Sequence, residues 1–568
     1  MACNTNTASE EYADFITRYY TSPDEYMQIA GTDCIDFIND QYAVVHLPLS
    51  AIAPLTRSAY TYSAIPKLYS LLDIAAVEAS GILQTSETPS LSNNGCGVLI
   101  GFIDTGIDYQ NPLFQNRDGT TRILGIWDQT VGTGNIIPEN TFRSTYGTPY
   151  TKFQIDEALA SEDPLSVVPT VDEHGHGTAL ASIAAGGSDE TNGFLGAAPE
   201  AYLAMVKLKP AKQYLREFFL IQEDADAYQE NDIMMGIVYL FSLARQYNTP
   251  LVICLGLGTN SGSHTGQSVL STLINEMSSY NGTAFVIAAG NETGFDHHYR
   301  GTISAGNNVH NVEIKVEEPT SGFSMEFWAD DVGAYSFGFL SPSGQFIQAP
   351  SVRSDAPETY RFLPGDTEIT VYSRIATVES AGQMIFVRFQ RPTPGIWTMI
   401  ITNLIDISGA FHIWLPCRGF IPDSIGFLRS DPDTIITGPG NTRQPITVAA
   451  YDHIRDSIYI HSGRGYSRTG QIKPELAAPG TDILAAGRRP GLYRRITGTS
   501  AAAAQVAGAA AILLSWGILE QNEPYMNSST LKTYLIRGAD RNPSLPYPNR
   551  EYGYGTLNLY QTFLRLRI

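Results

Sequence analysis

Three short segments carry the residue types that acyl transfer by a serine nucleophile requires. Ser500 stands in T-G-T-S-A-A-A-A, the histidines His174 and His176 stand in H-G-H-G-T, and Asp104 stands in I-D-T-G. A serine hydroxyl becomes a nucleophile when a histidine takes its proton and a carboxylate holds that histidine in the right tautomer. The order Asp, His, Ser along the chain is one of the orders in which such triads occur.

The residues after Ser500 predict a buried helix. Between Ala501 and Leu514 the chain has eight alanines in fourteen positions and no proline, a composition that favours a helix. Almost none of these residues is polar, so the helix belongs inside a large core. Ser500 in its first turn would meet unpaired backbone N–H groups and the positive end of the helix dipole. The alternative is that Ser500 only caps the helix.

Asp104 closes the run V-L-I-G-F-I, which is bounded by turn residues and predicts a buried parallel strand. Functional side chains gather at the carboxyl ends of such strands. In one alternative the aspartate merely caps a turn. In another, D-T-G belongs to an aspartic protease, although a single-chain aspartic protease would carry a second copy and this sequence has none. Asp108, one helical turn further on, is the weaker candidate for the carboxylate.

His174 and His176, together with Asp172 and Glu173, are also of the types that bind metal ions. A metal site built on H-x-H normally needs further His or Asp ligands close by, and the following A-L-A-S-I-A-A-G supplies none. The sequence therefore favours a catalytic base over a metal ligand. It predicts neither a metal nor a cofactor.

The composition indicates a large, acidic protein with several domains. The chain has 568 residues, 43% of them hydrophobic and 11% aromatic. This length exceeds that of one ordinary domain and predicts two or three domains. The formal charge is −21 and the sequence pI is near 4.9. Because such a charge repels polyanions, we expect no nucleic-acid ligand.

The cysteines and the N-terminus give expectations about the compartment. The N-terminal M-A-C-N-T-N-T-A-S has no basic and no apolar region, and no run of 18 apolar residues occurs. We therefore expect no signal peptide and no membrane span. The cysteines lack C-x-x-C spacing, so they predict neither a disulfide framework nor a zinc site and fit a reducing compartment. They are Cys3, Cys34, Cys96, Cys254 and Cys417.

Residues 1–75 predict a small α+β unit. The patterns at 15–20 and 26–29 are helix-like or mixed, whereas Y-A-V-V-H-L-P-L at 42–49 predicts a strand.

The remainder of the chain divides into three segments. Residues 76–304 alternate apolar strands with helical stretches, as in an α/β domain. Residues 305–428 instead alternate apolar and polar residues between turns, which predicts an all-β sandwich or jelly roll. Residues 429–568 form the last segment.

The sequence resembles the subtilisin-like serine proteases (family S8). The stretch G-T-S-A-A-A-A-Q-V-A-G at 498–508 matches the family's nucleophile motif G-T-S-M-A-A/S-P-H-V-A-G, and D-T-G and H-G-T precede it in the family's order. Ala501 stands for the usual Met, Ala504 for Pro and Gln505 for His. Alanine is tolerable at the proline position, because proline in a first turn removes only an N–H without an intrahelical partner.

This resemblance implies an α/β fold with a parallel sheet and helices on both of its faces. It assigns catalytic roles to Asp104, His176 and Ser500. His176 is selected because the family's catalytic histidine directly precedes G-T and opens a helix. His174 then becomes a neighbour that tunes or shields it. Residues 1–75 would be the propeptide, an intramolecular chaperone that the enzyme removes itself near 74–76.

The resemblance also assigns an oxyanion donor and a substrate edge. Asn291, in A-A-G-N-E, resembles the family's oxyanion asparagine, whose amide stabilises the tetrahedral intermediate; the alternative is an asparagine in a turn. Gly256, Leu257 and Gly258 stand at the edge that pairs with an extended substrate. A glycine pair after a strand is otherwise common, and no G-x-G-x-x-G follows to indicate a nucleotide site.

Because I-T-V-A-A-Y-D at 446–452 and I-K-P-E-L-A-A-P-G at 472–480 again resemble subtilisin-like segments, the resemblance implies that the β segment is an insertion in the protease fold. Its position is similar to that in the Csp proteases of clostridial spore germination. This similarity implies a cytoplasmic or spore-associated bacterial endopeptidase that processes itself and activates another proenzyme. Its partners would be protein substrates and its own prodomain. Two alternatives stay open: an inactive pseudoprotease that acts as a scaffold or signal sensor, and a general degradative protease.

Overall fold

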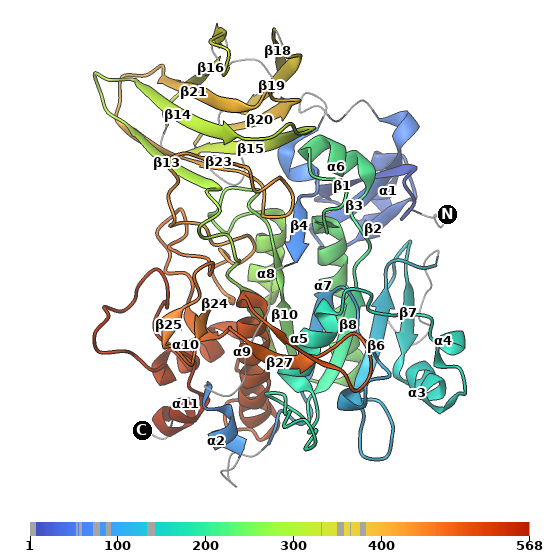
Figure 1. The fold of residues 1–568 in the computed structure, drawn as a ribbon. Coiled ribbons are helices and arrows are strands. Elements are labelled where there is room, and N and C mark those ends of the chain that lie inside the picture. The colour runs from blue at the N-terminus through green and yellow to red at the C-terminus, as the bar shows by residue number, and fades with distance from the viewer. Residues whose placement is uncertain are drawn as a thin grey trace.

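A computed structural model gives the structure of the chain. It describes residues 7–52, 55, 60–71, 80–86, 93–132, 142–330, 332–348, 357–363, 365–374 and 382–566. Figure 1 shows a central sheet with its helices, antiparallel sheets at one end, and a small N-terminal unit that lies beside both.

A mostly parallel sheet forms the middle of the molecule. Its strand order is β25-β24-β12-β10-β5-β8-β6-β7, and β26 also pairs with β24. All neighbours from β24 to β6 are parallel, while β25 and β7 are antiparallel. The strands are β5 (Leu99–Asp104), β6 (Ile123–Asp128), β7 (Thr148–Thr151), β8 (Tyr202–Lys207), β10 (Leu251–Leu255), β12 (Thr283–Ala288), β24 (Ile446–Asp452), β25 (Ser457–Ile458) and β26 (Leu476–Pro479).

Both faces of this sheet are buried, which explains the continuous apolar runs of its strands. Ile100 and Phe102 of β5 belong to the core that includes α5 and α9, whereas Leu99 and Ile103 belong to the core that includes α7 and α8. This confirms the predicted parallel sheet with helices on both faces. The helices of this part are α2 (Ile82–Ser86), α3 (Lys152–Ala160), α4 (Pro164–Val167), α5 (His176–Ala185), α6 (Gln213–Phe219), α7 (Glu230–Tyr247), α8 (Val269–Met277), α9 (Thr499–Leu514), α10 (Ser528–Gly538) and α11 (Leu559–Leu566).

Helix α9 is the predicted alanine-rich helix, and all of its residues are buried. Its extension to Leu519 makes it long and apolar enough to cross a membrane, but 83% of that apolar window is buried inside the protein. Its composition is therefore that of a core helix.

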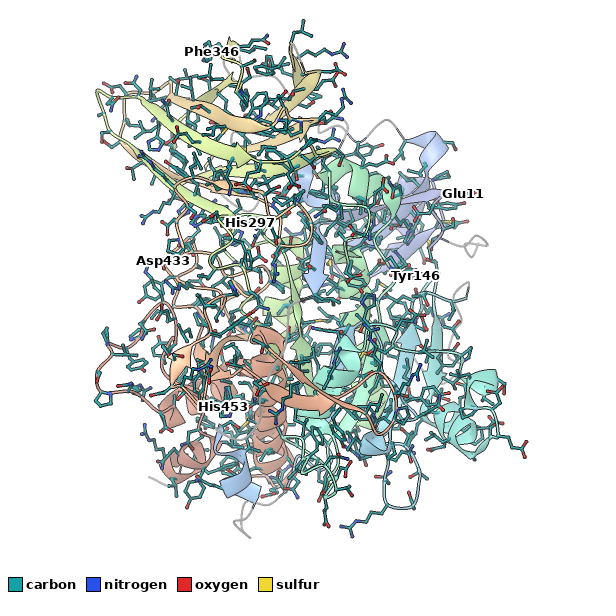
Figure 2. The ribbon with its side chains drawn as sticks, viewed as in Figure 1. Glu11, Tyr146, His297, Phe346, Asp433 and His453 are labelled. Carbon is teal, nitrogen blue, oxygen red and sulfur yellow. The ribbon has the colours of Figure 1, made fainter. Side chains whose placement is uncertain are left out.

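Two antiparallel sheets share one apolar core at the end of the molecule. Their orders are β13-β22-β15-β20-β19-β18 and β17-β16-β21-β14-β23. Figure 2 labels Phe346 at the outer end of these sheets and His297 where the chain enters them. The first strand, β13, begins at His298 and thus ahead of the predicted limit at 305. The strands are β13 (His298–Ile303), β14 (Val309–Val316), β15 (Gly322–Ala329), β16 (Tyr335–Leu340), β17 (Phe346–Gln348), β18 (Glu358–Phe362), β19 (Thr367–Arg374), β20 (Met384–Gln390), β21 (Gly395–Asn403), β22 (Gly409–Trp414) and β23 (Ile425–Phe427).

The N-terminal unit is a three-stranded antiparallel sheet with one helix, α1 (Pro23–Ala30). Its strand order is β1-β3-β2, with β1 at Tyr12–Arg18, β2 at Ile35–Phe37 and β3 at Tyr42–Pro48. Of the two stretches with helix-like or mixed patterns, residues 15–18 lie in β1 and pair with β3, whereas residues 26–29 lie in α1. The expectation of reduced cysteines fails at one position, since Cys34 is disulfide-bonded. By contrast, Cys96, Cys254 and Cys417 are free.

One apolar cluster joins all three parts of the molecule. The N-terminal segment contributes Tyr62 and Leu68, α6 contributes Phe218, and the antiparallel sheets contribute Trp328 and Trp414. Because these side chains are removed from water together, the docking of the N-terminal segment is coupled to the packing of the antiparallel sheets on the part that carries the parallel sheet.

Candidate active site

Asp104 and His176 meet at the carboxyl edge of the parallel sheet. Asp104 is the last residue of β5, and His176 is the first residue of α5. Their side chains are joined by a 2.7 Å contact between His176 Nδ1 and Asp104 Oδ1. Both residues are buried, so the ion pair that forms when the imidazole takes a proton is little screened by water.

Asp172 and Thr105 tie these two residues to each other. Asp172 Oδ1 accepts from Gly175 N–H and from Thr105 Oγ1, both at 2.7 Å, and its Oδ2 accepts from Thr178 N–H at 2.9 Å. Thr105 Oγ1 also accepts from Gly177 N–H at 3.0 Å. Asp172 thus accepts from backbone N–H groups at the start of α5, as an N-cap side chain does, and holds the first turn that carries His176 in place.

Ser500 lies in the first turn of α9, and that turn is anchored to the end of β12. Thr499 N–H donates to Asn291 Oδ1 at 3.1 Å, and Thr499 Oγ1 accepts from Gly290 N–H at 3.1 Å. The bond from Thr499 identifies the oxygen end of the Asn291 amide, so Nδ2 is the end with protons to donate.

The side chains of Ser500 and His176 both lie close to Gly256. Its carbonyl oxygen accepts from Ser500 Oγ at 3.0 Å. A Cβ on Gly256 would lie 3.3 Å from both Ser500 Cβ and His176 Cε1, and 2.6 Å from Leu180 Cδ1. Only a residue without a side chain fits here. The structure thus brings together Asp104, His176, Ser500, Asn291 and Gly256.

The strand that follows Gly256 is already paired. β11 (Leu257–Gly258) is antiparallel to β4 (Leu68–Leu71), with Leu257 opposite Leu71 and Gly258 opposite Ser70. On its other side β4 pairs with β9 (Tyr228–Gln229). A segment of the chain's own N-terminal region therefore lies extended between two strands next to Ser500. The short hairpin of β27 (Ile483–Ala486) and β28 (Tyr493–Ile496) precedes α9.

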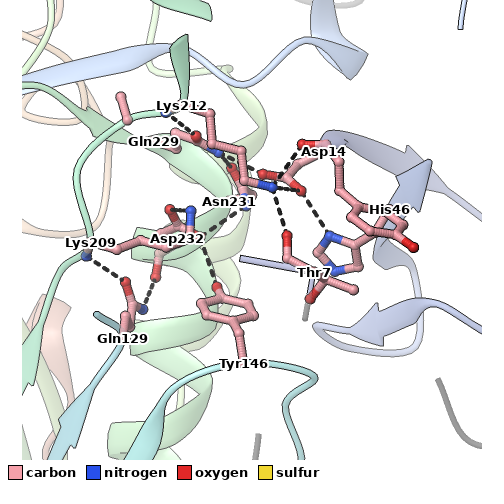
Figure 3. A network of polar contacts seen from close by, with 12 residues as sticks. Thr7, Asp14, His46, Gln129, Tyr146, Lys209, Lys212, Gln229, Asn231 and Asp232 are labelled. Carbon is pink, nitrogen blue, oxygen red and sulfur yellow. Dashed lines mark hydrogen bonds and ion pairs between the residues drawn. The ribbon is translucent and has the colours of Figure 1, made fainter. Parts of the chain in front are cut away.

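A buried polar network anchors the N-terminal unit to the part that carries the parallel sheet (Figure 3). Asp14 Oδ1 lies 2.8 Å from both Lys212 Nζ and His46 Nδ1. His46 Nε2 lies 3.0 Å from Asp36 Oδ2, so the imidazole stands between two carboxylates. Gln229 of the paired strand β9 donates to Asp14 Oδ2 at 2.8 Å.

The charges in this network hold one another in their ionised forms. Although burial opposes it, the pairing with Lys212 and His46 keeps the pKa of Asp14 well below its usual range. Burial also opposes the charged form of His46, but its bonds to Asp14 and Asp36 raise the pKa of His46 to about 9.

The other candidates from the sequence lie apart from this geometry. His174 is partly exposed and lies 3.5 Å from Asp226. Burial raises the pKa of Asp108 to about 6, and its backbone N–H donates to Thr178. In the sequence Asp172 stood out only as a possible metal ligand, whereas the structure places it at the start of α5. Its place four residues before His176 was the available signal.

Comparisons with known proteins show the family to which the chain belongs. The model of the subtilase family matches residues 95–323 and 429–555. The structure of the CspB protease of Clostridium perfringens is 31% identical with a TM-score of 0.75, and the match covers 86% of this chain and 98% of that one. Subtilisin-like protease 10 of Arthroderma otae is 40% identical over 85 residues, but the match spans only 15% of this chain and 20% of that protein. The chain therefore belongs to the subtilase family and is a subtilisin-like serine peptidase.

Proposed function

We propose that this peptidase cleaves proteins through an acyl-enzyme formed on Ser500. Ser500 Oγ attacks the scissile carbonyl carbon, His176 accepts the hydroxyl proton, and the same proton then goes to the leaving amine. Asp104 accepts from His176 Nδ1–H and so keeps Nε2 available as the base. The 2.7 Å contact between His176 and Asp104 beside a buried helix-terminal serine is the observation that carries the proposal.

Labelling with a fluorophosphonate tests this assignment. Such a probe forms a covalent bond with an activated serine, so the protein should be labelled at Ser500 and lose its peptidase activity in the same proportion. A pseudoprotease scaffold would remain unlabelled.

Asn291 would donate to the oxygen that becomes negative in the tetrahedral intermediate. Asn291→Leu is expected to lower kcat by about 10²–10³-fold, the range found for loss of such a donor in subtilisin. The measurement is kcat on a fluorogenic peptide. Asn291→Asp is the matched variant, because a carboxylate can still accept from Thr499 N–H but has no proton to donate. Full activity in Asn291→Asp would contradict the oxyanion role.

The same site is proposed to remove the N-terminal unit. The pairing of β4 with β11 supports this, since it delivers the chain to the serine as an extended strand. The predicted cut near 74–76 falls outside the described residues. We expect wild-type protein to separate into pieces of about 75 and about 490 residues at a rate independent of protein concentration, because cleavage within one chain is unimolecular.

N-terminal sequencing of the purified protein checks this processing. The larger piece should begin shortly after Leu71, and Ser500→Ala should stay whole. A wild-type protein that keeps its original N-terminus and is fully active would show that residues 1–75 are not a propeptide.

The N-terminal unit is expected to loosen as the pH rises from 6.5 to about 9. His46 is protonated in the folded protein up to that pH, compared with 6.5 for an ordinary histidine. Its contribution, on the order of 3 kcal/mol, is therefore complete below pH 6.5 and is lost as the pH rises through 9. In Ser500→Ala, intrinsic-rate-corrected amide exchange in β1 and β3 should lose protection between pH 7 and 9.5.

Adding the substitution His46→Gln to Ser500→Ala should remove most of this pH dependence. Burial also lowers the pKa of Lys212, but Lys212 is present in both proteins, so the difference between them isolates the imidazole. If the proteins with and without His46→Gln lost protection equally, the imidazole would not be the group responsible.

The pairing of β4 with β11 and β9 also favours a protease with few substrates, such as one that activates another proenzyme, over general degradation. A peptide must displace β4 before it can pair with β11. Only sequences that replace the contacts of β4 would do so readily.

A further inference from the structure

A buried ion pair between Lys67 and Glu230 lies at the N-terminal end of β4 and has no part in the proposed mechanism. Glu230 is the first residue of α7, and both side chains are almost completely buried. Lys67 Nζ lies 3.5 Å from Glu230 Oε2, and the Lys67 backbone N–H donates to the same oxygen at 3.2 Å. The Lys67 carbonyl accepts from Glu230 N–H at 2.9 Å.

These contacts continue the strand pairing of β4 by one residue toward the N-terminus. Leu68 pairs with Gln229 of β9, and Ser70 pairs with Gly258 of β11. Lys67 is therefore held as the next residue of the same extended segment, three positions before the residue opposite Gly258. A substrate that takes the place of β4 would present its own residue to Glu230 here.

The carboxylate of Glu230 depends on this position for its charge partner. Its Oε1 accepts a 3.4 Å bond from Leu270 N–H, but the described contacts of Oε2 all come from residue 67. A neutral residue at this position would leave a buried anion without a cation, which is far more costly than a neutral gap. The Lys67 ammonium also contacts the carbonyl and the ring of Tyr62, which belongs to the N-terminal segment itself.

We propose that Glu230 is a specificity-determining residue that selects a lysine or arginine in the substrate, three positions before the residue that pairs with Gly258. The substrate class is thus extended peptides with a basic residue upstream of the cleaved bond. This proposal rests on the proposed function, because it treats β4 as bound in the manner of a substrate.

The experiment compares quenched fluorogenic peptides of residues 64–77 on the processed wild-type enzyme. One peptide keeps Lys67, a second carries Lys67→Arg and a third carries Lys67→Met. A fourth combines Lys67→Met with Ala64→Lys, so that its net charge is unchanged. We expect kcat/KM for the peptides with lysine or arginine at position 67 to exceed that for both peptides with methionine there by about tenfold or more. Glu230→Gln should bring the ratio of lysine to methionine peptides close to one.

Glu223→Gln is the matched enzyme control, because it removes an exposed glutamate from the same region; it should keep the wild-type ratio. Equal rates for the lysine and methionine peptides on wild-type enzyme would overturn the proposal without any variant having to fold. So would an unchanged ratio in Glu230→Gln, or an enzyme labelled at Ser500 that cleaves none of the peptides. A protein that is neither labelled nor processed would instead contradict the proposed function.

Discussion

Replacement of Ser500 by alanine is expected to lower kcat by about 10⁶-fold, the loss found when the nucleophile of subtilisin is removed. The loss is this large because serine, histidine and aspartate act as a unit, so the others contribute little without the hydroxyl. The protein should still fold, since alanine fits a first turn already followed by four buried alanines. The measurement is kcat on a fluorogenic peptide together with fluorophosphonate labelling.

Ser515→Ala provides the matched control. Ser515 follows the last residue of α9, is also buried, and donates to the Cys96 carbonyl at 2.9 Å. Its loss removes a buried hydroxyl from the end of the same helix but should leave kcat within a few-fold of wild type. Undiminished cleavage by Ser500→Ala would end the assignment of the nucleophile.

Asp104→Asn is expected to lower kcat by about 10⁴-fold while the fold remains intact. An asparagine amide can donate to His176 Nδ1, and the imidazole would then carry its proton on Nε2, where the base is needed. The check is again kcat, with the thermal unfolding temperature as evidence of folding.

Asp108→Asn separates this role from a general need for acidic residues near β5. Asp108 was the weaker candidate in the sequence, and in the structure the carboxylate bonded to His176 is that of Asp104. Neutralising Asp108 should change kcat only a few-fold. If Asp108→Asn caused the larger loss, the two aspartates would have to exchange roles.

Local sequence was informative wherever one segment carries its own signal. The continuous apolar run of β5 and the alanine-rich stretch of α9 each formed the predicted element. By contrast, the pattern at 15–20 did not predict the element that forms there. Its mixed pattern has no clear period, and it becomes a strand only through pairing with β3.

Contacts between distant segments could not be obtained in this way. Asp172 looked like a possible metal ligand because its type was visible, whereas its bond from Thr105, which ties the start of α5 to the end of β5, joins segments that only the fold brings together. The pairing of Lys67 with Glu230 and the position of His46 between two carboxylates likewise join segments far apart in the chain.

The sequence by itself therefore determined the family resemblance, the order of the candidate catalytic residues and the elements that carry them, because short-range periodicity and motif spacing are properties of contiguous residues. Only the tertiary structure decided that β4 pairs with β11, directly after the glycine that accepts from Ser500. It also decided that the N-terminal segment, α6 and the antiparallel sheets share one core. Strand pairing and burial across the molecule depend on which surfaces meet, and no local pattern specifies that choice.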